Sequence, residues 1–302
     1  MTTASNLSRL MLAAMFATIP NAVWAMEPTP AVNAAEAAYS AASAATQRGP
    51  AQVALVGQAT LKVPEGYGYV PAKETVALLQ AMGNQPGESV QGMLVPAKEG
   101  GWFMVISFVK AGYIKDDDAR SWNADDMLTN IREGTEEDNK SRKARGIPEM
   151  DVVGWVEKPQ YDAGNQRLVW SLETRSRGVK DDSGVNYNTL VLGREGYMSM
   201  NMVTDRAAIE ALKPTAHQML AALAFDGGKR YADFDSKTDK IAEYGLAALV
   251  AGVAAKKLGL LAVIGVFIAK FAKVLIAAAV IGGGTVLKLF RRKQAAQSRD
   301  SA

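Results

Sequence analysis

Residues Gly101–Val109 read GWFMVISFV, and this stretch decides the fold class of the chain. It is a continuous apolar run rich in aromatic and β-branched residues, which is typical of a central strand that is buried on both faces. Shorter runs of similar character are present on both sides of it. We expect further strands at Val53–Val56, Thr60–Val63, Met150–Val156, Arg167–Thr174, Tyr187–Leu192 and Tyr197–Val203.

The last two of these strands are expected to form a hairpin, because only GREG at 193–196 separates them. Met198, Met200 and Met202 alternate with polar neighbours, so one face of the second strand should pack on a core. A soft binding surface is the alternative for the three methionines.

Helical spacing of apolar residues is present at Lys73–Met82 and at Ala124–Arg145. Asp205 can cap a further helix, and Pro214 then kinks this helix or starts a second one. Strands in meander order, with helices inserted and at the end, predict an α+β domain with a largely antiparallel sheet and packed helices.

The N-terminal end has the layout of a secretory signal peptide. Arg9 precedes the apolar stretch Leu10–Ile19, and VWA at 23–25 resembles the small-residue cleavage site of such signals. We therefore assign residues 1–25 to a signal peptide. Residues 26–50, which are rich in alanine and bordered by prolines, are expected to be a tether, and residues 51–243 an exported domain.

The C-terminal end has the composition of a membrane anchor. Residues 244–293 are mostly apolar and end in RRK at 291–293. The best transmembrane helical segment is 271–290, because Lys273 and Lys288 lie near its ends, where long side chains can reach the headgroups. The basic cluster predicts a short cytoplasmic tail at 294–302 and a periplasmic main domain at the bacterial inner membrane. A helical hairpin, or a buried core helix, is the alternative to a single span.

The charges are segregated along the chain. The net charge is +3, but residues 26–243 contain 24 Lys and Arg against 30 Asp and Glu, whereas residues 244–302 contain nine against one. The exported domain is therefore acidic, which excludes a nucleic-acid partner because such a partner requires a basic face.

No motif assigns a chemical activity. The chain has no cysteine, which excludes disulfides and thiolate sites. It has one histidine, His217, which we interpret as a structural residue of a helix. Gly66–Pro71, GYGYVP, lacks the third glycine of a dinucleotide loop and is expected to be a turn. Asp116–Asp118 is expected to be a solvated acidic loop, because consecutive aspartates point in different directions instead of around a calcium ion. We assign no catalytic, cofactor-binding or metal-binding residue and no cofactor.

Several strings together resemble a family of bacterial membrane-anchored proteins, domain of unknown function 2167. They are Gly66–Pro71, Gly101–Tyr113 with Trp122, GWVEKP at 154–159, NYNTLVLGR at 186–194 and FDGGKRY at 225–231, followed by a hydrophobic end punctuated by lysines. The resemblance implies an envelope protein with a C-terminal membrane segment and supplies no catalytic residues. Strand order and the final helix leading to Phe225 also resemble the fold of PsbP-like and Mog1-like domains, which mostly act as assembly or binding modules.

Two membrane signals without a nucleophile or metal signature favour a non-enzymatic module. We expect it to contact the lipid bilayer through its C-terminal segment and to bind or assemble another envelope protein. One alternative is an envelope hydrolase that uses a carboxylate pair, with Asp162 or Glu173 as one member. Another is an oligomeric membrane protein with a role in transport or stress sensing.

Overall fold

The computed structural model describes residues 30–98, 101–179 and 183–251. The predicted signal peptide at 1–25, the span at 271–290 and the tail at 294–302 lie outside the described residues. Within the described ranges, none of the helices has the length and apolar character that crossing a membrane requires.

An eight-stranded sheet forms the centre of the described domain, and neighbouring strands within it run antiparallel. Its strands, in spatial order, are β1 (Gln47–Arg48), β4 (Tyr67–Pro71), β5 (Val90–Pro96), β6 (Trp102–Val109), β10 (Tyr197–Asp205), β9 (Ser183–Leu192), β8 (Arg167–Ser176) and β7 (Met150–Asp162). Every residue of β6 is buried, and the strand lies inside the sheet. The α+β class, the antiparallel sheet and the central position of this strand are therefore confirmed.

One face of this sheet packs against α4 (Ile209–Ala221) and a second, three-stranded sheet. The second sheet has the order β11 (Leu223–Phe225), β3 (Ala59–Val63) and β2 (Ala51–Leu55). Met198, Met200 and Met202 are fully buried in the apolar cluster between these layers. The methionine face is therefore core, as the alternation predicted.

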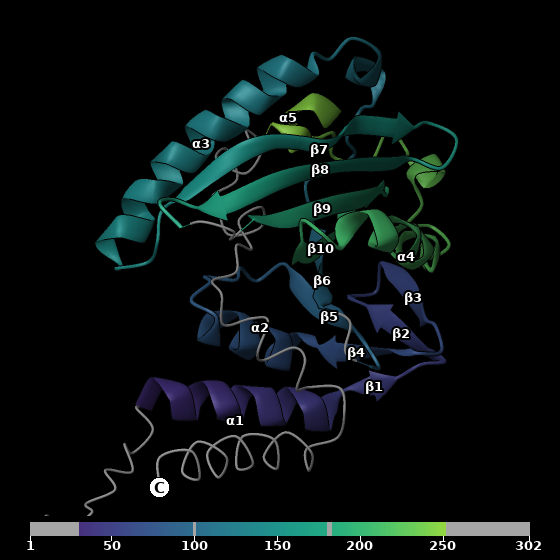
Figure 1. Cartoon of the computed structure of the whole chain (residues 1–302). Coiled ribbons are helices and arrows are strands. Elements are labelled where there is room, and N and C mark those ends of the chain that lie inside the picture. Colours follow the sequence, from purple (N-terminus) through teal and green to yellow (C-terminus); the bar gives the residue numbers. More distant parts are fainter. Residues whose placement is uncertain (1–29, 99–100, 180–182, 252–302) are drawn as a thin grey trace, which may run out of the picture.

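The opposite face is covered by helices in two places. At one end, α2 (Ala72–Ala81) and α1 (Pro30–Ala45) lie beside β4 and β5. At the other end, α3 (Ala124–Ala144) lies along the outer strand β7, and the short α5 (Leu246–Val250) lies nearby (Figure 1). Single 3-10 turns, η1 (Asp117–Arg120) and η2 (Tyr231–Asp233), complete the described elements.

The prediction of a tether at 26–50 is wrong where the structure describes this segment. Residues Pro30–Ala45 form α1, whose Ala42 is buried and whose Tyr39 packs against the same apolar cluster as Leu78 of α2. Gln47 then pairs with Tyr69 of β4. The alanine-rich sequence forms a helix because alanine favours this conformation, and its small side chains let α1 lie close to α2.

Two further expectations about local structure are corrected. Of the stretch Gly66–Pro71 only Gly66 lies in a turn, because Tyr67–Pro71 is strand β4 and Tyr69 is buried. α4 continues through Pro214. Its N-cap is Ala208, so the Asp205 side chain does not cap this helix.

The boundary of the domain also lies beyond the expected residue 243. Leu246, Leu249 and Val250 of α5 are buried in the same apolar cluster as Leu190 of β9. The first residues of the stretch predicted as membrane anchor therefore belong to the core of the domain.

Candidate binding site

A cluster of polar side chains gathers around one buried hydroxyl beneath α4. Tyr187 of β9 is fully buried, and its Oη donates to Glu157 Oε2 of β7 at 3.2 Å. The same oxygen lies 3.1 Å from Nε2 of His217, which α4 supplies. Three elements that are distant in sequence therefore meet at one oxygen atom.

The strand register explains this convergence. Ser171 of β8 is the cross-strand partner of Tyr187 on one side and of Glu157 on the other, so the three side chains project from the same face. Ser171 is fully buried, and its Oγ has no hydrogen-bond partner in the described part of the chain. The cluster thus contains one hydroxyl that is bonded twice and one that is not bonded.

Lys213 and Glu210 of α4 complete the cluster, in which two carboxylates outnumber one ammonium group. The Lys213 Nζ lies 3.5 Å from Glu157 Oε2 and 3.0 Å from Glu210 Oε2. Two carboxylates thus share one ammonium group. The Glu157 side chain is 17% exposed and the Lys213 side chain 26%, so the rim is reachable from solvent.

Burial, together with the nearby Glu157 carboxylate, raises the pKa of Tyr187 far above its usual value. Tyr187 therefore keeps its proton and has one hydrogen to donate, which the carboxylate accepts. Because the Tyr187 hydrogen is donated to Glu157, the hydrogen bond between Nε2 of His217 and Tyr187 Oη is donated by the imidazole N–H. The site offers fixed donors and acceptors that suit recognition of a polar group.

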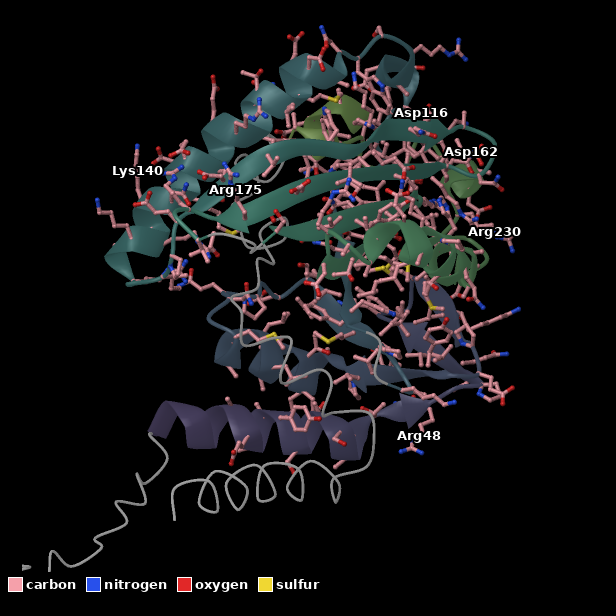
Figure 2. The ribbon with its side chains drawn as sticks, in the orientation of Figure 1. Arg48, Asp116, Lys140, Asp162, Arg175 and Arg230 are labelled. Atoms are coloured by element: carbon pink, nitrogen blue, oxygen red, sulfur yellow. The ribbon has the colours of Figure 1, made fainter. Side chains whose placement is uncertain are left out.

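Two acids of the 116–118 loop, Asp116 and Asp118, have structural partners. Asp116 accepts a hydrogen bond of 2.7 Å from the Tyr161 hydroxyl, and Figure 2 labels Asp116 at the same end of the molecule as Asp162. Asp118 accepts from the backbone N–H groups of Leu246 and Ala247 at 3.1 and 3.0 Å, which holds the first turn of α5. Within the described ranges no three acids or histidines are grouped as a metal site.

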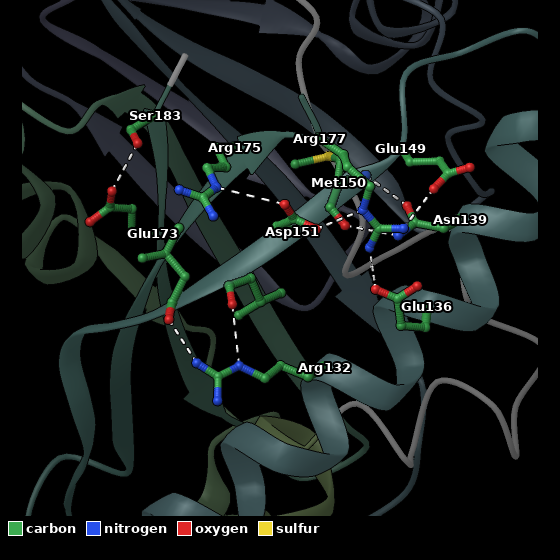
Figure 3. Close-up of polar contacts among 12 residues, drawn as sticks. Arg132, Glu136, Asn139, Glu149, Met150, Asp151, Glu173, Arg175, Arg177 and Ser183 are labelled. Atoms are coloured by element: carbon green, nitrogen blue, oxygen red, sulfur yellow. Dashed lines mark hydrogen bonds and ion pairs between the residues drawn. The ribbon is translucent and has the colours of Figure 1, made fainter. Parts of the chain in front are cut away.

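The two acids named for a hydrolytic pair have structural partners in the described part of the chain. Asp162 accepts from the Gly164 backbone at 2.9 Å and from Asn165 at 2.7 Å, and so stabilises a turn. Glu173 binds Ser183 at 2.8 Å and Arg206 at 3.1 Å, and its contact with Ser183 is visible in Figure 3.

The outer edge of β7 is closed by side chains of α3 (Figure 3). Asn139 donates to Met150 O and accepts from Met150 N, both at 2.8 Å, and Arg132 donates to Val153 O at 2.7 Å. Arg177 is bound by Glu136 of α3 and by Glu149 and Asp151. The Asn139 and Arg132 contacts occupy backbone groups to which another strand could otherwise add.

Comparison with known proteins identifies the family. The profile described as "Protein of unknown function (DUF2167)" matches residues 47–280. The chain belongs to this family. None of the curated proteins matches this DUF2167 chain.

Three solved structures share a weak fold likeness with the DUF2167 chain. Cyanobacterial PsbP (CyanoP) from Synechocystis sp. PCC 6803 is 13% identical, with a TM-score of 0.36, over 61% of this chain and 94% of that one. The Ran-binding protein Mog1p of Saccharomyces cerevisiae is 9% identical, with a TM-score of 0.32, over 58% and 94%. A Pseudomonas aeruginosa protein of unknown function, a putative regulator, is 10% identical, with a TM-score of 0.23, over 56% and 92%. At these values the likeness carries no argument about function.

The sequence of the DUF2167 chain indicates only some members of the Tyr187 cluster. His217 was singled out, but as a structural residue, and Glu157 stands within the family string GWVEKP without a role. The four-residue spacing of Lys213 and His217 places both on one side of a helix. No pattern indicated that Tyr187, on a strand beneath them, would supply the shared hydroxyl.

Proposed function

We propose that this protein is a binding or assembly module for another component of the bacterial cell envelope. The C-terminal region tethers it to the inner membrane, and the domain lies in the periplasm. Support for the location comes from the sequence alone, from the signal-like residues 1–25, the apolar segment 271–290 and the basic cluster that follows it. The Tyr187 cluster carries the binding part of the proposal.

The cluster favours recognition over covalent chemistry because its members are bonded to one another. Glu157 is held by Tyr187 and Lys213, and the His217 ring is held by Tyr187. Such mutual bonds fix the positions of donors and acceptors without the need for a ligand, which lowers the entropic cost of binding. Two carboxylates against one ammonium favour a partner group that is cationic or rich in hydrogen-bond donors.

Quantitative co-purification tests this proposal. A tagged full-length chain is crosslinked briefly in its own membranes, extracted in mild detergent and analysed by mass spectrometry. Glu157→Gln and His217→Ala should each reduce recovery of a reproducible partner, by roughly tenfold for Glu157→Gln, because the acceptor loses the charge that strengthens its hydrogen bonds. Gln218→Ala is the matched control, since Gln218 is the exposed neighbour of His217 on α4. Equal recovery with all four proteins would refute the role of the cluster.

The proposed orientation has its own test, which the absence of cysteine makes simple. Ser298→Cys places one thiol near the C-terminus. A membrane-impermeant maleimide should label it only after the inner membrane is permeabilised. Labelling of intact spheroplasts would contradict a cytoplasmic C-terminus and favour the hairpin alternative.

A further inference from the structure

Strand β2 of the three-stranded sheet has a free edge. It pairs with β3 on one side, and in the described part of the chain its other side has no paired strand. Residues 49–57, GPAQVALVG, contain no charged side chain. Natural sheets usually protect an edge with charges, with bulges or with a covering helix. Asn139 and Arg132 of α3 do so for β7, and Figure 1 shows β2 on the side of the molecule away from α3.

The strand register identifies the backbone groups that this edge presents. The N–H of Lys62 in β3 donates to the Ala222 carbonyl at 2.9 Å, so the backbone groups of Lys62 point away from β2. Gln52 lies opposite Lys62, and the two therefore form a pair without mutual hydrogen bonds. The N–H and C=O of Gln52 point to the free edge, and so do those of Ala54, two residues further along. Both residues are exposed, so the edge offers donors and acceptors to another strand.

Val56, which follows β2, is an unusual residue for its position. The Gln58 N–H donates to the Leu55 carbonyl at 2.9 Å and closes a tight turn with Val56 and Gly57 at its centre. Their φ angles are +47° and +62°. Glycine and asparagine suit this left-handed conformation, whereas it strains a β-branched side chain. Val56 is also 54% exposed, so a contact that buries this valine would offset both costs.

A second copy of the same edge fits these features. When two β2 strands pair antiparallel with Gln52 opposite Ala54 of the other copy, the free N–H and C=O groups of both residues are matched. Val53 then lies on the two-fold axis of an isologous contact. At each end Val56 lies opposite Pro50, which is also exposed, so the apolar turn gains an apolar neighbour. Because residues 49–57 are uncharged, the pairing brings no like charges together and selects no charged partner.

We propose that two copies of the chain associate through their β2 edges, so that the two three-stranded sheets become one continuous sheet. Two five-residue strands bury little surface, so the association should be weak and should depend on concentration. The contact satisfies the backbone groups of Gln52 and Ala54 and covers Val56. The inference does not depend on the proposed function, because the β2 edge contains no member of the Tyr187 cluster.

Sedimentation equilibrium of the full-length protein in a density-matched detergent tests the association. Ala54→Lys should raise the dissociation constant of the dimer by roughly tenfold or more, because two ammonium groups approach each other across the two-fold axis. Ala224→Lys, at the exposed middle residue of β11 in the same sheet, is the matched control and should leave the constant unchanged. A native protein that stays monomeric up to about 100 µM, or equal constants for the two variants, would overturn the proposal.

A charge pair tests the register of the two strands in the same assay. Gln52→Glu alone should weaken the dimer, because it adds two like charges near the axis. Gln52→Glu combined with Ala54→Lys should restore the native dissociation constant to within about threefold, because opposite charges then face each other directly across the strand pair. A double variant that dimerises no better than Ala54→Lys alone would overturn the two-fold pairing.

Disulfide trapping supplies an independent readout in this cysteine-free chain. At the two-fold axis the two Val53 residues form a pair without mutual hydrogen bonds, whose Cα atoms lie about 4.5 Å apart and within the range of a disulfide. Mild oxidation of Val53→Cys should therefore give a covalent dimer. Val63→Cys is the matched control, since Val63 is a buried valine of the neighbouring strand β3 in the same apolar cluster, and it should give none. No covalent dimer from Val53→Cys, or equal yields from both variants, would overturn the proposal.

Discussion

Replacement of Asn139 by alanine should strongly destabilise the domain. Asn139 is 3% exposed, and its carboxamide binds both backbone groups of Met150 at 2.8 Å, so it connects α3 to the outer edge of β7. Asn139→Ala removes both hydrogen bonds. It also leaves the N–H and C=O of Met150, a residue that is 6% exposed, without partners.

The expected loss follows from these contacts. Two net hydrogen bonds contribute about 1 kcal/mol each, and each buried backbone group left unpaired costs about 1–3 kcal/mol more if water does not reach it. Partial access of water at a sheet edge reduces the second contribution. We therefore expect a loss of about 2–4 kcal/mol in the free energy of unfolding, which corresponds to a Tm decrease of roughly 5–15 °C.

Urea unfolding of the full-length protein, followed by far-UV circular dichroism, measures this loss. The midpoint should fall while the slope stays unchanged, because the surface exposed on unfolding is the same. Asn130→Ala is the matched control, since Asn130 is an exposed asparagine of the same helix, and it should change the free energy by less than about 0.5 kcal/mol. Equal midpoints for the two variants would refute the stabilising role of the Asn139–Met150 hydrogen bonds between α3 and β7.

Three further predictions concern other parts of the fold. Tyr187→Phe removes the hydroxyl shared by Glu157 and His217 and should lower the free energy of unfolding by about 1–2 kcal/mol in thermal melts. A bidentate contact with Arg194 lowers the pKa of Asp239 to about 2, so its stabilising effect is present above the usual aspartate pKa and is lost as pH falls from about 4 towards 2. Asp239→Asn should therefore flatten the acid-unfolding curve in that window, and a curve as steep as that of the native protein would contradict the pairing. Gly112→Ala should lower the Tm, because φ is +90° and the new Cβ would lie 2.6 Å from the Lys240 carbonyl oxygen, at a cost of about 1–3 kcal/mol.

The elements that sequence patterns predicted are those with strong local periodicity. Gly101–Val109 corresponds to β6, and the alternating methionines face the core as expected. The helical spacing at Lys73–Met82 corresponds to α2, and that at Ala124–Arg145 to α3. In each case the period of the apolar residues specifies both the element and its buried side.

The elements that were missed depend on partners far away in the chain. α1 was expected to be a tether because its alanines give little apolar contrast, and only the presence of α2 shows which side is buried. β4 was expected to be a turn because of its glycines. Gly68 is instead required by close packing, since a Cβ there would lie 2.5 Å from Thr46 Cγ2.

The candidate sites were even less accessible from sequence. His217 was visible as the only histidine, but its partner Tyr187 is 30 residues away and joins it only through the packing of α4 on the sheet. The pairing of Asn188 with Asn201 likewise depends on strand register, because the two become neighbours only in the β9–β10 pair. Neither arrangement has a spacing that a motif could record.

Site-specific photocrosslinking from α4 tests the central claim, recognition of an envelope component at the Tyr187 cluster. A photoreactive amino acid is placed at the exposed position 218 or 221 of α4 in the full-length chain in its native membrane, and at the exposed Lys140 on α3 for comparison. We expect one defined adduct from 218 or 221, absent at 140 and weakened by Glu157→Gln. Adducts of equal intensity at all three positions, or none at 218 and 221, would contradict recognition at the Tyr187 cluster.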